Sequence, residues 1–133
     1  MSRRARKILF FLFLLFFFFK CFICFGGELS AGVSAKLNLL KADEYTSCLV
    51  MMKDQVNTRE LNLKLNPNLI TRKMIHATTL SALKSKAESS QTELITYLNR
   101  KTLDGGVKQF KTFWITNAVL VTAKREVIEN IAA

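Results

Sequence analysis

The hydrophobic positions of the chain form two patterns, a continuous apolar run near the start and spaced apolar residues afterwards. Residues 8–19 are all Ile, Leu or Phe, Lys20 interrupts the run, and residues 21–25 continue it. From residue 36 onward, apolar residues recur mostly at intervals of three and four, which is typical of amphipathic helices. The pattern predicts a leader over residues 1–35 and a helical domain over residues 36–133.

The first half of the domain is expected to contain two helices. Residues 36–56 carry apolar side chains at helical spacing without Gly or Pro, and a strand at Cys48–Met52 is the alternative. Residues 57–68 alternate briefly and then reach Pro67, so they are predicted to form a short strand, an extended connector or the frayed end of the first helix. Residues 69–88 show helical spacing again.

The second half is expected to contain two more helices. The third begins near Gln91, because Ser90 and Glu93 have the spacing of a capping box. It ends before the glycines of the segment 103–106, since Gly tolerates the left-handed conformation that follows many helices.

Residues 107–131 form the most amphipathic segment and are predicted to be the fourth helix. Trp, Ile, Val and Thr are common in strands, so a β interpretation of Phe113–Thr122 is the alternative. Period and length favour the helix. The expected fold class is all-α, with the leader followed by a small bundle of about four helices.

The leader has the features of an export signal. Arg3, Arg4, Arg6 and Lys7 precede the apolar run, and small residues follow it, as in a secretory signal peptide. Cleavage is expected after Ala35, with Ala31 as the second position. The alternative is an uncleaved anchor, because residues 8–25 would span about 27 Å as a helix against a bilayer core of about 30 Å. In both cases the basic residues stay in the cytoplasm and the domain crosses the membrane, so it is secreted or extracytoplasmic.

Charge is shared between the two parts. The chain has a net charge of +10, and residues 36–133 hold fifteen basic and nine acidic residues. A moderately basic domain favours anionic surfaces. No basic stripe interleaved with aromatic residues is present, so nucleic-acid binding is not expected.

Residues capable of catalysis are few. Cys48 is the only cysteine and His76 the only histidine after the leader, which holds Cys21 and Cys24. We expect Cys48 to be a buried free thiol or, alternatively, to pair between chains. A His–Cys pair without a third residue is too little to indicate nucleophilic catalysis, and structural zinc needs more ligands. No catalytic residue, cofactor or metal is therefore predicted.

Phe110, Phe113 and Trp114 form one aromatic cluster, which is either core packing or an interaction face. The functional hypothesis is a small exported helical protein that binds an unidentified protein partner and performs no catalysis. Membrane contact is expected through residues 8–25, at least during export. The alternative is a single-pass membrane protein whose helical domain assembles with other membrane subunits.

Overall fold

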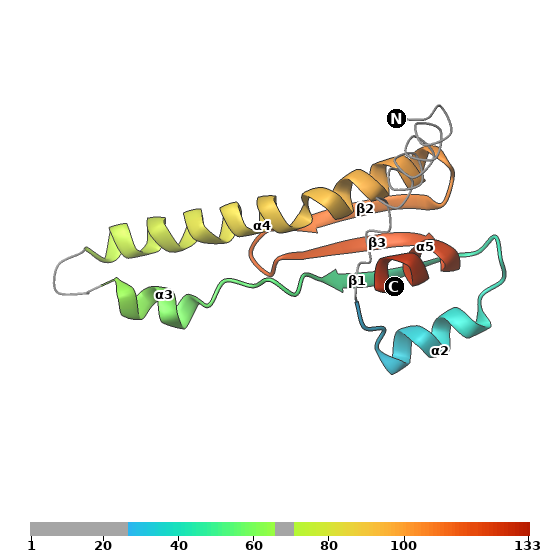
Figure 1. The fold of residues 1–133 in the computed structure, drawn as a ribbon, viewed down its shortest axis with the longest axis horizontal. Helices are drawn as coiled ribbons and strands as arrows, with labels where there is room; N and C mark the ends of the chain where they lie inside the picture. The colour runs from blue at the N-terminus through green and yellow to red at the C-terminus, as the bar shows by residue number, and fades with distance from the viewer. Residues whose placement is uncertain (1–26, 66–70) are drawn as a thin grey trace, which may run out of the picture.

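The computed structural model describes residues 27–65 and 71–133, so the predicted leader run lies outside the described residues. The elements, in chain order, are α2 (Ala31–Leu39), β1 (Tyr45–Met51), α3 (Thr58–Lys64), α4 (Arg72–Leu103), β2 (Val107–Phe113), β3 (Ala118–Lys124) and α5 (Arg125–Ala132). The described residues form a three-stranded sheet, and α4 and α5 pack against it (Figure 1). The strand order is β1-β3-β2, and both neighbours of β3 run antiparallel to it.

The all-α prediction is wrong, and the segment 107–131 accounts for most of the error. This segment forms the hairpin of β2 and β3 followed by the short helix α5. The alternative strand at Phe113–Thr122 overlaps most of β3, but it omits nearly all of β2 and includes the turn between the two strands. Apolar residues at positions 107, 110, 114 and 121 mimic a helical period, and residues 118–123 are too uniformly apolar to show the polar alternation of a half-buried strand.

Asn117 makes the tight turn of this hairpin possible. It is the residue before β3 and has a φ of 42°, a left-handed conformation that Asn tolerates better than most residues. The backbone carbonyl of Asn117 accepts a hydrogen bond from the Met52 amide at 3.1 Å. The turn is thereby tied to the end of β1.

The side chain of Asn117 also connects the hairpin to α4. Its Nδ2 donates to the Asp54 carbonyl at 2.7 Å, and its Oδ1 accepts from Gln91 Nε2 at 2.9 Å. Ser90 Oγ lies within hydrogen-bond distance of both Asn117 side-chain atoms. Asn117 and Gln91 are 2% and 3% exposed, so this network satisfies polar groups that have lost contact with water.

The two helices predicted over 69–88 and from Gln91 onward are one continuous helix, α4. Ser90 does not cap a new helix, because its hydroxyl donates to the Lys86 carbonyl one turn earlier. The predicted end is confirmed: α4 stops at Leu103 and Gly105 adopts a φ of 69°. The amide of Gly106 then bonds the Lys101 carbonyl at 2.9 Å.

The helix predicted over 36–56 is also wrong. Helix α2 ends at Leu39, and strand β1 occupies Tyr45–Met51, close to the alternative strand at Cys48–Met52. The expected connector 57–68 contains α3, which Asn57 caps by accepting a hydrogen bond from the Glu60 amide. Both predicted cleavage positions, Ala31 and Ala35, lie within α2.

The core lies between one face of the sheet and the helices. Helix α4 contributes Leu94 and Leu98, β3 contributes Val119 and Val121, and α2 contributes Leu37, all at most 2% exposed. Other members of the core cluster are Val107, Ala123, Val127, Ile128 and Ile131.

Helix α4 is much longer than the sheet that it covers. Its 32 residues span about 48 Å, whereas a strand of seven residues spans about 23 Å. Ala87 is the first residue of α4 that is buried. Residues 72–86 therefore extend past the sheet beside α3, and we call α3 together with residues 72–86 the helical arm (Figure 1).

Candidate protein-binding site

The face of the sheet opposite the core is open and partly apolar. Successive residues of a strand point to opposite faces, so Tyr45, Leu49 and Met51 of β1 share the face away from the core. Their exposed fractions are 41%, 55% and 56%. Antiparallel sheets commonly leave one face in water, but that face is then usually polar. Apolar side chains that are exposed together, as on this face, are typical of surfaces that bind a partner.

The strand register shows how the open face continues across the sheet. Leu49 lies opposite Leu120 of β3, and Leu120 lies opposite Lys111 of β2. Met51 lies opposite Ala118 of β3, and Ala118 in turn lies opposite Phe113 of β2. We call Tyr45, Leu49, Met51, Lys111, Phe113, Leu120 and Lys124 the open sheet face.

Two lysines give the open sheet face a positive rim. Lys124 Nζ lies 5.8 Å from the centre of the Tyr45 ring, and Lys111 Nζ lies 5.4 Å from that of Phe113. Lys124 also pairs with Asp43 at 3.3 Å, whereas Lys111 has no carboxylate partner among the described residues. Such cation–π contacts hold the ammonium groups beside aromatic rings. The face can therefore bind a surface that combines apolar side chains with carboxylates.

The structure separates the predicted aromatic cluster. Phe110 packs against the core, whereas Phe113 belongs to the open sheet face, because three positions along a strand reverse the direction of the side chain. Trp114 lies in the turn after β2, with Lys84 Nζ 5.2 Å above its ring. The sequence prediction of a single aromatic cluster is therefore wrong. Sequence reasoning did not assign Leu49, Met51 and Leu120 to an interaction face. The available signal was the pair of strand alternatives, Cys48–Met52 and Phe113–Thr122, which contain them.

Cys48 lies on the core side of β1 and is a free, partly buried thiol. Burial raises the pKa of Cys48, and the positive charge of Lys36 partly offsets the rise. The thiolate, which is the reactive form, is therefore less populated in the folded chain than in the unfolded chain.

We expect Cys48 to react with iodoacetamide at pH 8 several-fold more slowly in the folded chain than in urea. Mass spectrometry of the peptide that contains Cys48 measures both rates. Because the folded pKa is raised, this thiol also lowers stability as the pH rises above the unfolded value of about 8.5. Equal rates in the folded and unfolded chain would contradict the burial of the thiol.

His76 does not join Cys48 in a site. It is exposed on the helical arm, whereas Cys48 packs against the core. Among the described residues, no group of three or more His, Cys, Asp or Glu side chains is placed to hold a metal ion.

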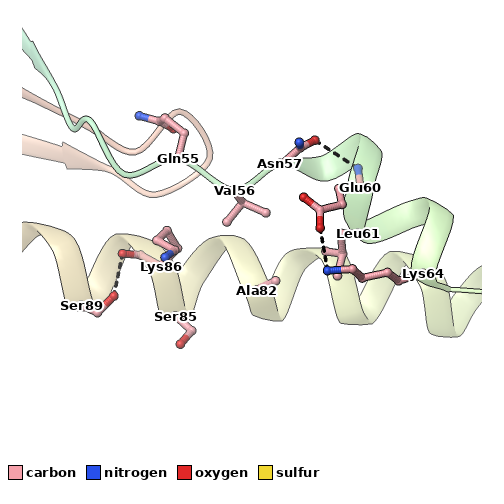
Figure 2. A pocket seen from close by; sticks show the side chains of 10 residues that line it. All are labelled: Gln55, Val56, Asn57, Glu60, Leu61, Lys64, Ala82, Ser85, Lys86 and Ser89. Carbon is pink, nitrogen blue, oxygen red and sulfur yellow. Dashed lines mark hydrogen bonds and ion pairs between the residues drawn. The ribbon is translucent and has the colours of Figure 1, made fainter.

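An open groove of about 500 Å³ lies between α3 and α4 (Figure 2). Its charged groups are already paired: Glu60 bonds Lys64 at 2.7 Å, and Lys86 bonds Asp54 at 2.8 Å. Lys64 lowers the pKa of Glu60. Its hydrogen bond to the carboxylate has the larger effect, and its positive charge has the smaller one. Leu61 and Ala82 supply apolar lining. The first pair lies within α3 and the second joins α4 to the loop before α3, so the charged groups that line the groove are all paired.

The fold and the open sheet face define a small mixed α/β domain with one helix-covered and one free side of an antiparallel sheet. No known family model matches the chain, and no solved structure was found to match it. The chain is similar to bacillopeptidase F of Bacillus subtilis (strain 168), with 27% identity over 99 residues. The similarity covers 68% of this chain but only 7% of that protein, so the chain spans a small part of its relative. Within residues 27–65 and 71–133, no helix has the length and apolar character needed to cross a membrane.

Proposed function

We propose that the chain is a non-catalytic, exported domain that binds a peptidase through the open sheet face. The observation that carries the proposal is the apolar centre of this face, where Leu49 and Leu120 lie side by side and are 55% and 38% exposed. A surface of this kind lowers its free energy when a partner removes it from water, at about 25 cal/mol per Å² of apolar area.

The similarity to bacillopeptidase F supports a peptidase as the partner. The matched segment is a small fraction of a much longer protein that is named as a peptidase. The residues described here bring together neither His76 and Cys48 nor a metal site. A segment of this size, whose described residues assemble no His–Cys pair and no metal site, fits a domain that accompanies and controls a peptidase rather than one that hydrolyses peptides.

The positive rim supports an acidic margin on the partner. Lys111 is exposed and has no carboxylate partner among the described residues, so a partner carboxylate could pair with it on docking. Complementary charges mainly speed association and select the partner, while the apolar centre supplies affinity. The expected leader would place the domain on the extracytoplasmic side, so we expect it to meet its partner there.

The double substitution Leu49→Asp and Leu120→Asp tests this proposal. It places two carboxylates at the centre of the open sheet face, so we expect the Kd for bacillopeptidase F to rise at least about tenfold. Surface plasmon resonance with the full chain measures the change, and a peptidase assay on the same mixtures measures any control of activity.

Leu103→Asp is the matched control, because Leu103 is 89% exposed at the end of α4 and lies off the sheet. It should leave binding unchanged. Circular dichroism establishes that all variants are folded. Absence of binding by the parent chain would exclude this peptidase as a partner, and equal weakening by the control would exclude the open sheet face.

A further inference from the structure

The positive charge of the domain is concentrated on the helical arm. Residues 58–86 hold six basic residues (Arg59, Lys64, Arg72, Lys73, Lys84 and Lys86) and one acidic residue, Glu60. The remainder of residues 36–133 holds nine basic and eight acidic residues and is close to neutral. We call the part of residues 36–133 outside residues 58–86 the body. The body is nearly neutral, whereas residues 58–86 carry a net charge of +5.

Several of these six basic side chains form no ion pair with an acidic side chain among the described residues. Lys64 pairs with Glu60 and Lys86 with Asp54, and Lys84 lies over the Trp114 ring. Arg59, Arg72 and Lys73 are exposed and have no carboxylate partner among the described residues. These cations attract an anionic surface without first having to give up an ion pair.

The end of the arm also exposes large apolar side chains. Leu63 near the end of α3 is 77% exposed, and Met74 near the start of α4 is 56% exposed. Both ends lie at the far end of the arm, away from the sheet (Figure 1). No residue described between Met52 and Lys86 is buried, so the arm adds little to the core.

We propose that the helical arm binds the surface of an anionic lipid membrane. Basic side chains near such a surface attract lipid headgroups, and neighbouring apolar side chains enter the boundary between headgroups and acyl chains. At this end of the arm, Leu63 and Met74 supply exposed apolar side chains, and Arg72 and Lys73 supply positive charge. A nucleic acid is the other common polyanion, but single strands bind on aromatic platforms, and residues 58–86 contain no Phe, Trp or Tyr.

The membrane contact of the arm is distinct from that expected of the leader, and the experiment separates the two. Vesicles of phosphatidylcholine alone and vesicles that also contain phosphatidylglycerol are sedimented with the full chain. The basic residues of the leader also favour anionic lipid, so the arm is measured by the part of the excess binding on anionic vesicles that substitutions in the arm remove. We expect Arg72→Glu with Lys73→Glu to reduce this excess at least about tenfold, and 0.5 M salt to reduce it similarly.

Lys41→Glu with Lys108→Glu is the matched control, because it makes the same charge change at exposed positions of the body. It should retain most of the excess binding. Leu63→Ser with Met74→Ser should weaken the excess several-fold without changing the net charge. Equal losses in the arm and body charge variants would overturn the proposal, since net charge alone would then explain binding.

Limited proteolysis gives an independent measurement on the unsubstituted full chain. Trypsin should cut after Arg72 and Lys73 several-fold more slowly on anionic vesicles than on phosphatidylcholine vesicles, while cutting after Lys41 is unaffected. Equal rates on both lipids would contradict arm contact. The proposal would also fail if the arm variant lost affinity for a single-stranded oligonucleotide but kept its binding to anionic vesicles.

Discussion

Asn117→Leu is expected to lower the free energy of unfolding by about 3 kcal/mol or more. The left-handed conformation of residue 117 costs most residues about 1–2 kcal/mol, and Asn tolerates it better. Leu also removes the hydrogen bonds that Asn117 makes with Gln91 and the Asp54 carbonyl. A buried polar group left without a partner costs about 1–3 kcal/mol. Urea unfolding of the full chain, followed by Trp114 fluorescence in the adjacent turn, measures the loss.

Two further variants separate the two causes. Asn117→Gly keeps the backbone conformation accessible and removes only the side-chain bonds, so its loss should be smaller by about 1–2 kcal/mol. Asn117→Asp keeps the acceptor oxygens but lacks the Nδ2 donor to Asp54 and should fall between the parent and Leu variants. A loss below 1 kcal/mol for Asn117→Leu would mean that the turn and its network do not stabilise the hairpin.

Leu98→Ala is expected to lower the free energy of unfolding by about 2–5 kcal/mol. Leu98 has no exposed surface and belongs to the core cluster between α4 and the sheet. The substitution removes three carbon atoms from this closely packed cluster, and the neighbouring side chains can collapse into the cavity only partly. Urea unfolding followed by circular dichroism measures the change.

Leu103→Ala on the same helix is its control. Leu103 is 89% exposed, so the same chemical change should alter stability by no more than about 0.5 kcal/mol. Equal losses at positions 98 and 103 would contradict the placement of the core on one face of α4.

Local signals in the sequence predicted the helix around residues 91–103 and its glycine-dependent end. They did not predict that α4 packs against a sheet. Leu94 and Leu98 are one helical turn apart, and this spacing is the same whether the helix packs against a sheet or against other helices. The strands were hidden for a physical reason. Val121 faces the core and its neighbour Leu120 is partly exposed and apolar, so β3 lacks the clean polar alternation that identifies a half-buried strand.

The candidate site was missed for the same reason. Phe113 is part of the predicted aromatic cluster, but across the sheet its neighbours are Ala118 of β3 and then Met51 of β1, which is distant in sequence. Leu120 meets Leu49 across seventy-one positions, a contact that follows from strand pairing rather than from local spacing. The concentration of charge between residues 58 and 86 was visible in the sequence. Its meaning depended on knowing that α4 extends past the sheet.

Site-specific photo-crosslinking tests the central claim most directly, namely that the open sheet face contacts a peptidase. A benzophenone amino acid replaces Leu120 in one full-length chain and Leu103 in another, and each is irradiated with bacillopeptidase F. We predict a covalent adduct from position 120 and none from position 103. An adduct from position 103 alone, or none from position 120 despite measurable binding, would contradict docking through the open sheet face.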